Sequence, residues 1–274
     1  MENNTIELLA FDMDNTLLLP DKSLSTRNAQ ALKQLHANGK HIVLTTGRPL
    51  PNVAPFIEQL GLTQSDDYVI LFNGGMIKNT HTNENILNRH FILKDMQTAF
   101  HIITDLGLPI DIVAEKQVYS ITDFGQSDYV KLVNGIVPYQ QVALADLPND
   151  LVFNKFVIYA DEVQLDHLET VLQQHPELNH ILSFVRSRRI LLEIVPSGVN
   201  KGSALSALLE HFNLTAENLM AFGDEENDYP MLKLAKVGVA MDNAIPQIKD
   251  IATDITKSNA DDGVGVFLEK YFNL

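Results

Sequence analysis

Short apolar runs recur along the first third of the chain, and each ends in polar or glycine-rich residues. The runs with their endings are Ile6–Phe11 before Asp12-Met13-Asp14, His41–Thr45 before Thr46-Gly47-Arg48, and Asp67–Phe72 before Asn73-Gly74-Gly75. Such runs, bounded by turn residues, predict buried strands. Helices are predicted between them over Ser23–Lys40, with Ser25 as the N-cap, and over Pro51–Leu60. Alternating strands and helices predict parallel strands in a layered α/β fold.

The pattern changes at about Asn83, where helices become mixed with paired short strands. Helices are predicted over Lys94–Leu106, Asp128–Val133 and Val163–His175, a strand over Phe153–Tyr159, and hairpins over Ile110–Ala114 with Gln117–Ile121 and over His180–Arg186 with Ile190–Val195. Because hairpins pair strands antiparallel, this stretch predicts an α+β unit. We therefore expect a domain over residues 84–189, inserted into a core formed by residues 1–83 and 190–274.

The α/β pattern returns after the insertion. Helices are predicted over Lys201–His211, Tyr229–Ala235, Ile245–Ala252 and Asp262–Phe272, and strands over Leu219–Phe222 and Val237–Met241. The first of these strands runs into Gly223-Asp224-Glu225-Glu226-Asn227-Asp228, another polar ending. Since parallel strands present their carboxyl ends at one edge of a sheet, the polar endings are expected to meet there. The predicted fold class is α/β, with a Rossmann-like core, a mainly parallel sheet and an inserted α+β domain.

Asp12 and Asp14 are the candidate reactive residues at that edge. Residues two apart in an extended segment point the same way, so both carboxylates can face one centre. Two carboxylates held together repel each other, and a bound cation is the simplest way to keep both ionised. Taken alone, the pair is equally typical of a solvated turn, or of a helix N-cap formed with Thr16.

Composition and charge limit the classes of protein to consider. With 274 residues and 45% hydrophobic content, the chain is long enough for one large globular domain or two of ordinary size. It has no cysteine, which excludes disulfides, thiolate nucleophiles and cysteine-ligated metal sites. A formal net charge of −15, without a basic stripe, argues against nucleic-acid and anionic membrane partners. The polar start Met1-Glu2-Asn3-Asn4 and the lack of a long apolar run predict a cytoplasmic protein.

Four short motifs, in order along the chain, resemble those of the haloacid dehalogenase-like superfamily. They are Asp12-Met13-Asp14-Asn15-Thr16-Leu17, Thr46-Gly47-Arg48, Asn200-Lys201-Gly202 and Gly223-Asp224-Glu225-Glu226-Asn227-Asp228. The long insertion between the second and third motifs is similar to the cap of the Cof-type phosphatases, the class IIB branch. The resemblance covers essentially the whole chain, including Ser258–Val264 near its end. Any one motif is a weak signal, and the four in order are a strong one.

The resemblance implies a Mg²⁺-dependent phosphatase. Asp12 is the implied nucleophile, which forms an aspartyl-phosphate, and Asp14 is the implied general acid and base. An acid at this position favours phosphatase over dehalogenase chemistry, because a leaving alkoxide needs a proton and a halide does not. Asp12, the backbone carbonyl of Asp14 and Asp224 are the implied Mg²⁺ ligands, in an oxygen-only site. Asp228 is expected to support these ligands rather than to bind the metal itself.

The remaining motif residues are implied to hold the phosphoryl group or the substrate. Lys201, which is counted with Thr46 among the catalytic residues, is expected to neutralise the charge shared by nucleophile and phosphate. The other implied contacts are Met13, Thr46, Gly47, Arg48, Asn73, Gly74 and Asn227. The cap is expected to exclude water and bulky substrates, which favours a small phosphorylated metabolite such as a sugar phosphate or a phosphorylated cofactor.

Several features stay open at this point. Glu193 is either a substrate contact or part of a solvated face, and Arg186, Arg188 and Arg189 either guide a phosphorylated ligand or are ordinary exposed charges. Asn15 stands where most members of the superfamily have glycine; asparagine tolerates left-handed backbone angles, so the loop and the activity should survive. The alternatives to a phosphatase are a phosphomutase of the same superfamily, a phosphoacceptor signalling module and a phosphometabolite sensor without turnover. The physiological substrate and the oligomeric state are not predicted.

Overall fold

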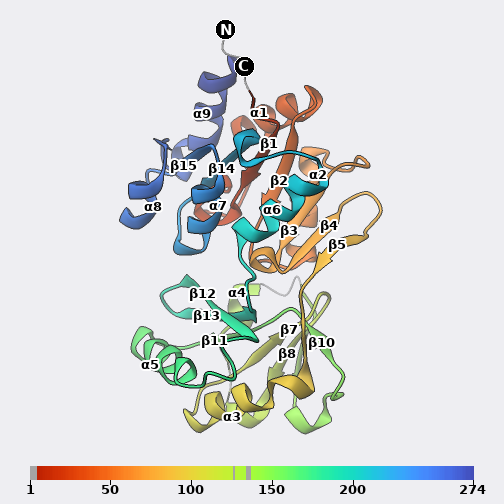
Figure 1. Ribbon diagram of the computed structural model, residues 1–274, viewed down its shortest axis with the longest axis vertical. Coiled ribbons are helices and arrows are strands. Elements are labelled where there is room, and N and C mark those ends of the chain that lie inside the picture. The colour runs from red at the N-terminus through yellow and green to blue at the C-terminus, as the bar shows by residue number, and fades with distance from the viewer. Residues whose placement is uncertain (1–4, 126, 134–136) are drawn as a thin grey trace. The chain divides into compact units, whose positions relative to one another are not determined.

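The structure is a computed structural model that describes residues 5–125, 127–133 and 137–274. The chain folds into two compact units (Figure 1). Unit 1 comprises Met1–Arg48, Val53–Asn88 and Asn200–Leu274, and unit 2 comprises Pro49–Asn52 and Arg89–Val199. Both expected boundaries, after residue 83 and before residue 190, therefore lie earlier in the chain than the observed ones.

The boundaries differ because of the pairing of two short strands. Asn85–Asn88 (β5) pairs with Met76–Asn79 (β4) in the sheet of unit 1, which extends that unit past residue 83. Leu191–Pro196 (β13) pairs with Lys155–Tyr159 (β11) and with Leu182–Arg188 (β12) in unit 2. This strand therefore belongs to the insertion and not to the core.

Unit 1 is built on an eight-stranded sheet in the order β16-β15-β14-β1-β2-β3-β4-β5. Its other strands are β1 (Leu8–Phe11), β2 (His41–Thr45), β3 (Tyr68–Leu71), β14 (Leu219–Gly223), β15 (Val237–Ala240) and β16 (Asp254–Ile255). Neighbours from β16 to β3 are parallel, whereas β4 and β5 are added antiparallel at one edge. The mainly parallel sheet is confirmed. The edge hairpin is not among the predicted elements, because its short strands are rich in asparagine, a residue depleted in strands.

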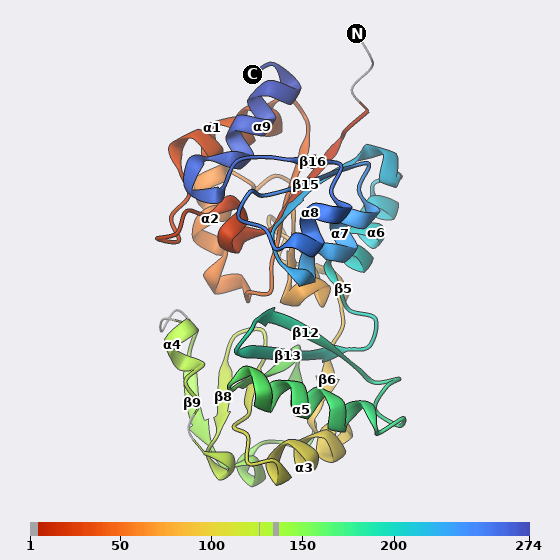
Figure 2. The same cartoon turned by 90° about the vertical axis from the view of Figure 1, so that its left-hand side faces the viewer.

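Helices cover both faces of this sheet. They are α1 (Thr26–Ala37), α2 (Ala54–Leu60), α6 (Lys201–His211), α7 (Tyr229–Leu234), α8 (Pro246–Ile251) and α9 (Gly263–Phe272). The helix α1 packs against α2 and α9, and α7 packs against α6 and α8. Figure 2 shows the first group on one side of the sheet and the second group on the other. Ser25 caps α1, as predicted, by accepting a hydrogen bond from the backbone N–H of Asn28 at 3.1 Å.

The strand β1 lies inside the sheet, covered on both faces. Its four residues are all buried, and it pairs in parallel with β2 on one side and with β14 on the other. A continuous apolar run, rather than an alternating one, is typical of such a strand. It delivers the next residue, Asp12, to the carboxyl edge of the sheet.

Unit 2 contains a six-stranded sheet in the order β12-β13-β11-β7-β8-β9, and a separate pair of β6 with β10. Its further elements are β6 (Phe91–Ile92), β7 (Asp111–Val113), β8 (Val118–Ile121), β9 (Tyr139–Val142), β10 (Val152–Phe153), α3 (Gln97–Asp105), α4 (Val130–Val133) and α5 (Glu162–Gln173). Phe156 and Ile194 of the sheet share one buried cluster with Phe100 of α3 and Leu168 of α5. These two helices therefore cover one face of the sheet. The α+β character and the hairpins β7–β8 and β12–β13 are confirmed.

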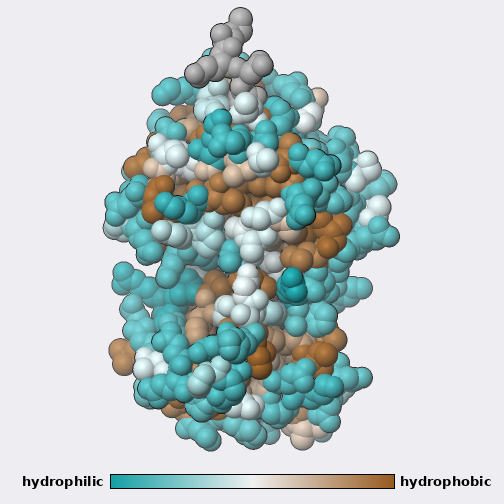
Figure 3. Space-filling view, viewed as in Figure 1, coloured by the Kyte–Doolittle hydropathy of each residue, from teal (hydrophilic) through white to brown (hydrophobic). Residues whose placement is uncertain are grey.

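The face of the molecule seen in Figure 3 is largely polar. Figure 3 shows hydrophilic residues predominating on the face in view, with smaller apolar patches between them. This agrees with the formal charge of −15. Among the described residues, no helix combines the length and the apolar character that crossing a membrane requires.

The turn after β1 depends on one left-handed residue. Met13–Leu17 forms a turn in which Asp14 is extended, with a ψ of 124°, and Asn15 has a φ of 60° and a ψ of 5°. The prediction that Asn15 accepts a left-handed backbone is confirmed. The side-chain amide of Asn243 donates to the Asn15 carbonyl at 2.8 Å, which fixes the turn against the loop before α8.

We predict that Asn15→Ala lowers the free energy of unfolding by about 1 kcal/mol, because the alanine Cβ makes the left-handed conformation costly. Asn15→Gly should change it less, because glycine adopts these angles freely. Urea unfolding followed by circular dichroism measures both variants. Equal stability of the two would show that the left-handed angle carries no cost at this position.

Candidate active site

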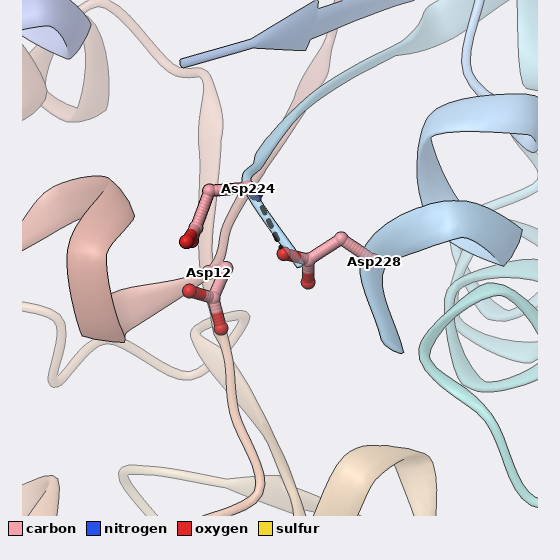
Figure 4. Close-up of side chains that lie close together, drawn as sticks. All are labelled: Asp12, Asp224 and Asp228. Atoms are coloured by element: carbon pink, nitrogen blue, oxygen red, sulfur yellow. Dashed lines mark hydrogen bonds between the residues drawn. The ribbon is translucent and has the colours of Figure 1, made fainter. Parts of the chain in front are cut away.

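Three carboxylates meet at the carboxyl edge of the sheet of unit 1. Asp12 directly follows β1, Asp224 directly follows β14, and Asp228 immediately precedes α7. Figure 4 shows the three side chains gathered around one point. Each offers one oxygen within 4.8 Å of the others, and all three residues are buried. Because like charges repel strongly at such a separation in a buried site, the cluster needs cations to stay ionised.

The ammonium group of Lys201, the first residue of α6, is one such cation. Its side chain is fully buried, and Nζ lies 2.6 Å from Oδ1 of Asp12 and 2.6 Å from Oδ1 of Asp228. Asn200 caps α6 by accepting a hydrogen bond from the backbone N–H of Ser203 at 2.8 Å. The capped helix therefore fixes the direction in which the lysine side chain leaves the backbone.

Burial and charge shift the pKa values in this cluster. Burial raises the pKa of Asp12 to about 7, although the ammonium group of Lys201 opposes the shift. Burial also raises the pKa of Asp224 to about 9, and the charges of Asp12 and Asp228 add to it. Burial acts to lower the pKa of Lys201, but the carboxylates of Asp12 and Asp228 raise it above its usual range. Lys201 contacts two of the three carboxylates, so a divalent cation would complete the compensation of charge.

The carboxylate of Asp228 is held by the strand end that it faces. Its Oδ2 accepts hydrogen bonds from the backbone N–H groups of Asp224 and Glu225 at 2.8 and 3.1 Å, while its Oδ1 contacts Lys201. Gly223 leaves room for this arrangement, since a Cβ there would lie 2.5 Å from the Cβ of Asp228. Both oxygens of Asp228 therefore contact donors of the protein.

Thr16 orients the carboxylate of Asp224. Its buried hydroxyl donates to Oδ1 of Asp224 at 2.7 Å, across 208 positions of sequence. The interpretation of the acidic pair as a helix N-cap is wrong, because the side chain of Asp12 makes no capping hydrogen bond to the turn that follows it. The turn serves instead to bring Thr16 to Asp224.

The loops after β2 and β3 are tied to the same edge. The backbone N–H of Asn73 donates to the Thr46 carbonyl at 3.0 Å, and the side-chain amide of Asn227 donates to Oδ1 of Asn73 at 3.2 Å. Gly74 has a φ of 101°, and a Cβ there would clash with the backbone carbonyl of Asn200 at the start of α6. All four predicted motifs therefore meet in one packed region of unit 1.

Met13, Thr46 and Gly47 differ in what they can offer a ligand. The side chain of Met13 is fully buried, so only its backbone is left to contact one. The hydroxyl of Thr46 accepts a hydrogen bond from the backbone N–H of Arg48 at 3.2 Å and keeps its own proton to donate. A Cβ at Gly47 would lie 2.9 Å from Oδ1 of Asn73, so a side chain there would require the Asn73 side chain to shift.

Two cationic side chains hold Asp14. The guanidinium group of Arg48 donates from Nε to Oδ2 and from Nη2 to Oδ1, each at 2.8 Å. The ammonium group of Lys22 also lies 2.8 Å from Oδ1. Burial acts to raise the pKa of Asp14, but the hydrogen bonds and charges of Arg48 and Lys22 hold it well below its usual range. In this arrangement Asp14 is an ionised acceptor and not a proton donor.

Glu193 lies in unit 2, on β13. Its Oε2 is 2.6 Å from Nζ of Lys155 on β11, and its Oε1 accepts a hydrogen bond from the hydroxyl of Ser187 at 2.8 Å. Both charged residues are buried. The interpretation of Glu193 as part of a solvated face is therefore wrong.

The three arginines near the β12–β13 turn differ in their surroundings. Arg186 contacts Asp166 and Glu169 of α5 at 2.7 and 2.8 Å, and its Nη1 donates to the Arg189 carbonyl at 3.0 Å. Arg188 and Arg189 are exposed. Arg186 therefore ties the turn to α5.

Thr16, Lys22 and Lys155 are partners of the predicted residues that the sequence pattern does not assign. Lys22 lies in a polar loop, where a charge is ordinary, so nothing in the pattern links it to Asp14. Lys155 does leave a signal, because it interrupts the apolar residues of a predicted buried strand. A charge at such a position requires a buried partner.

Comparison with known proteins shows the family to which this α/β protein belongs. Residues 9–268 match the haloacid dehalogenase-like hydrolase family. A candidate phosphatase of Streptococcus pyogenes serotype M6 is 32% identical over 97% of this chain and 98% of its own length. The 5-amino-6-(5-phospho-D-ribitylamino)uracil phosphatase YitU of Bacillus subtilis is 30% identical over 97% of this chain and 98% of its own length.

Solved structures of the same fold support this family assignment. A haloacid dehalogenase-like hydrolase from Bacteroides thetaiotaomicron superposes with a TM-score of 0.85 at 28% identity, covering 97% of this chain and 100% of that one. A subclass IIB sugar phosphatase shares the fold, with a TM-score of 0.81 at 22% identity over 97% and 99% of the two chains. The chain belongs to the haloacid dehalogenase-like hydrolase family. Several of its relatives are named phosphatases, and the resemblance to this family inferred from the four motifs is confirmed.

We predict that the metal-free protein loses stability as the pH rises. In the folded state the pKa values of Asp12 and Asp224 are about 7 and about 9, so the folded chain holds protons that the unfolded chain releases at much lower pH. The unfolding free energy therefore falls with rising pH, by up to about 1.4 kcal/mol per pH unit for each group. Thermal unfolding in chelator should show a Tm that decreases from about pH 5 to about pH 9.

Asp224→Asn should flatten this decline, because it removes the group with the higher pKa. Glu226→Gln changes an exposed carboxylate in the same loop and should retain the decline. Identical slopes for the two variants would place the titration elsewhere in the chain.

Proposed function

We propose that this protein is a Mg²⁺-dependent phosphatase that hydrolyses small phosphate monoesters through an aspartyl-phosphate on Asp12. The observation that carries the proposal is the position of Asp12, buried at the end of β1 with Lys201 at 2.6 Å and the carboxylates of Asp224 and Asp228 beside it. Phosphoryl transfer needs a positioned nucleophile and compensation of charge, and this group of residues supplies both.

Asp12 is proposed as the nucleophile. One of its oxygens attacks phosphorus while the bond from phosphorus to the leaving oxygen breaks, which gives an acyl phosphate. Water then attacks phosphorus, releases phosphate and restores the carboxylate. Lys201 would offset the charge that nucleophile and phosphate share, with the N-terminus of α6 adding to its effect.

The donor set fits Mg²⁺, which prefers oxygen ligands. Asp12, Asp224 and the backbone carbonyl of Asp14 are proposed to hold the ion. Asp228 is proposed to support them, because its oxygens already contact Lys201 and two backbone N–H groups. When bound, the ion would supply positive charge to the carboxylates and to the phosphoryl oxygens.

Asp14 is proposed as the general acid and base. It would give a proton to the leaving alcohol and later take one from the attacking water. Its ion pairs with Arg48 and Lys22 describe a resting arrangement, which Asp14 must leave before it can donate.

The loop residues are proposed to hold the phosphoryl oxygens. The Thr46 hydroxyl, the Gly47 amide and the Asn227 side chain are the direct donors, and the Asn73-Gly74 turn supports them through its contacts with Thr46 and Asn227. Unit 2 is proposed to act as the cap that selects the substrate.

A small phosphorylated metabolite is the proposed substrate class. YitU is named for an aminouracil phosphate, and a relative from Enterobacter sp. (strain 638), 32% identical over 88% of this chain, is named HMP-PP phosphatase. These names support small soluble substrates rather than phosphoproteins.

Phosphate release from sugar phosphates, nucleotides, flavin phosphate and pyridoxal phosphate should require Mg²⁺ and stop in chelator. We expect release from a few members of this panel, ranked by kcat/KM. Mg²⁺ should also raise the Tm of the wild-type protein more than that of Asp224→Asn. Absence of release from every member, from protein shown to be folded, would favour a phosphomutase or a sensor instead.

Asp14→Asn should lower kcat on an alkyl phosphate by about 10²- to 10⁴-fold, because the leaving alkoxide loses its proton donor. The loss should be smaller on p-nitrophenyl phosphate, whose leaving group needs no proton. Asp250→Asn, which changes an exposed carboxylate on α8, is the matched control and should keep full activity. Equal losses on the two substrates would contradict the role of Asp14 as an acid.

A further inference from the structure

We infer that Lys22 and Arg48 form a binding site for a second anionic group of the substrate, a carboxylate or a phosphate close to the leaving oxygen. In the structure, the carboxylate of Asp14 fills this site. The inference rests on the proposed phosphatase function and deepens it by naming a substrate class. Lys22 and Arg48 together are called the second-anion site.

The second-anion site has the donor geometry of an anion receptor. Arg48 directs Nε and Nη2 at the two oxygens of the Asp14 carboxylate, each at 2.8 Å, and Lys22 adds a third donor at 2.8 Å. A guanidinium fork matches the oxygens of a carboxylate or a phosphate. The site therefore recognises the shape and charge of an anion, and Asp14 is one anion that fits.

Two separate loops supply the cations. Arg48 lies in the loop after β2, and Lys22 lies in a tight turn closed by the hydrogen bond from its backbone N–H to the Leu19 carbonyl at 2.8 Å. Lys22 has a φ of 67°, a left-handed conformation that is uncommon for lysine. Backbone conformations of this kind concentrate at functional loops. The Lys22 and Arg48 side chains remain 42% and 21% exposed, so a ligand from solution can reach the second-anion site.

Asp14 cannot occupy this site and serve catalysis at once. To protonate the leaving oxygen, Asp14 has to turn away from both cations. Lys22 and Arg48 contact the same oxygen, Oδ1, so its departure leaves two positive groups close together. Their repulsion opposes the departure, and an anionic group of the substrate removes that repulsion. A substrate that carries such a group therefore helps to release Asp14 for proton transfer.

The geometry also limits where the second anion lies in the substrate. Asp14 moves by rotation about its own side-chain bonds, so the leaving oxygen must be within one short side chain of the second-anion site. A carboxylate whose carbon lies about two bonds from the ester oxygen meets this condition best. The carboxylate of 2-phosphoglycerate is such a group, and that of 3-phosphoglycerate is one bond further away.

The test uses two pairs of compounds that differ in one carboxylate. They are 2-phosphoglycerate with glycerol 2-phosphate, and 3-phosphoglycerate with glycerol 3-phosphate, each measured as a competitor of p-nitrophenyl phosphate hydrolysis in Mg²⁺. We expect 2-phosphoglycerate to compete at least about tenfold better than glycerol 2-phosphate, as a charged hydrogen-bonded contact would give. The 3-substituted pair should show a smaller ratio. Where the compounds are also hydrolysed, the same order should appear in kcat/KM.

Variants at Lys22 test whether this residue causes the preference for the compound with the carboxylate. Lys22→Gln should lower the ratio of the first pair, because it removes one of the two cations, and Lys22→Arg should keep the ratio. Lys33→Gln, which removes an exposed lysine on α1, is the matched control and should leave the ratio unchanged. Circular dichroism verifies that each variant is folded.

A wild-type ratio of one or less, or a ratio that Lys22→Gln does not change, overturns the inference. Hydrolysis of p-nitrophenyl phosphate continues in that case, so the phosphatase function stands. Absence of that hydrolysis, together with a silent panel, contradicts the phosphatase function and the inference with it.

Discussion

The arrangement of the site depends on the buried ammonium group of Lys201. It contacts Asp12, 189 positions away, and Asp228, 27 positions away, so it joins the start of the chain to its last third. Removing one partner of such a buried pair typically costs about 3 to 5 kcal/mol, because a charge is left without compensation. The contacts that stabilise the fold here are the same ones that orient the proposed nucleophile.

The backbone around the carboxylates makes their close approach possible. The absent side chain at Gly223 gives Asp228 its place, and two backbone N–H groups engage one of its oxygens. On the other side, the left-handed Asn15 closes the turn that brings Thr16 to Asp224. The acidic cluster therefore receives donors from three segments, which are the turn after β1, the start of α6 and the loop after β14.

Much of this site could be predicted from local pattern. The buried run of β1 and the polar residues that follow each parallel strand place Asp12, Thr46 and Asp224 along one edge, because sheet geometry requires it. The contact between Asp14 and Lys22 could not be predicted in this way. It depends on a left-handed turn and on the length of the lysine side chain, and neither leaves a periodic signal in the sequence.

The same reasoning explains the two errors in the domain boundaries. The strands of the β4–β5 hairpin are short and mix apolar residues with asparagine, so hydrophobic periodicity does not mark them. The expected boundary at residue 190 divides the predicted hairpin of β12 with β13, which the structure keeps whole in unit 2. The buried pair of Glu193 and Lys155 follows from the pairing of β13 with β11, which the sequence does not predict.

The inserted unit is attached to the rest of the chain by two unequal junctions. It begins after β5, an edge strand whose residues are largely exposed. It ends at Val199, directly before Asn200, which caps α6 one residue before Lys201. An insertion or deletion at the first junction affects only β5, which pairs with one neighbouring strand. At the second junction it would displace Asn200, the N-cap of α6, and Lys201. If another domain were inserted between these points, the length of its first connection could vary. The length of its second connection could not, because Asn200 and Lys201 must keep their positions.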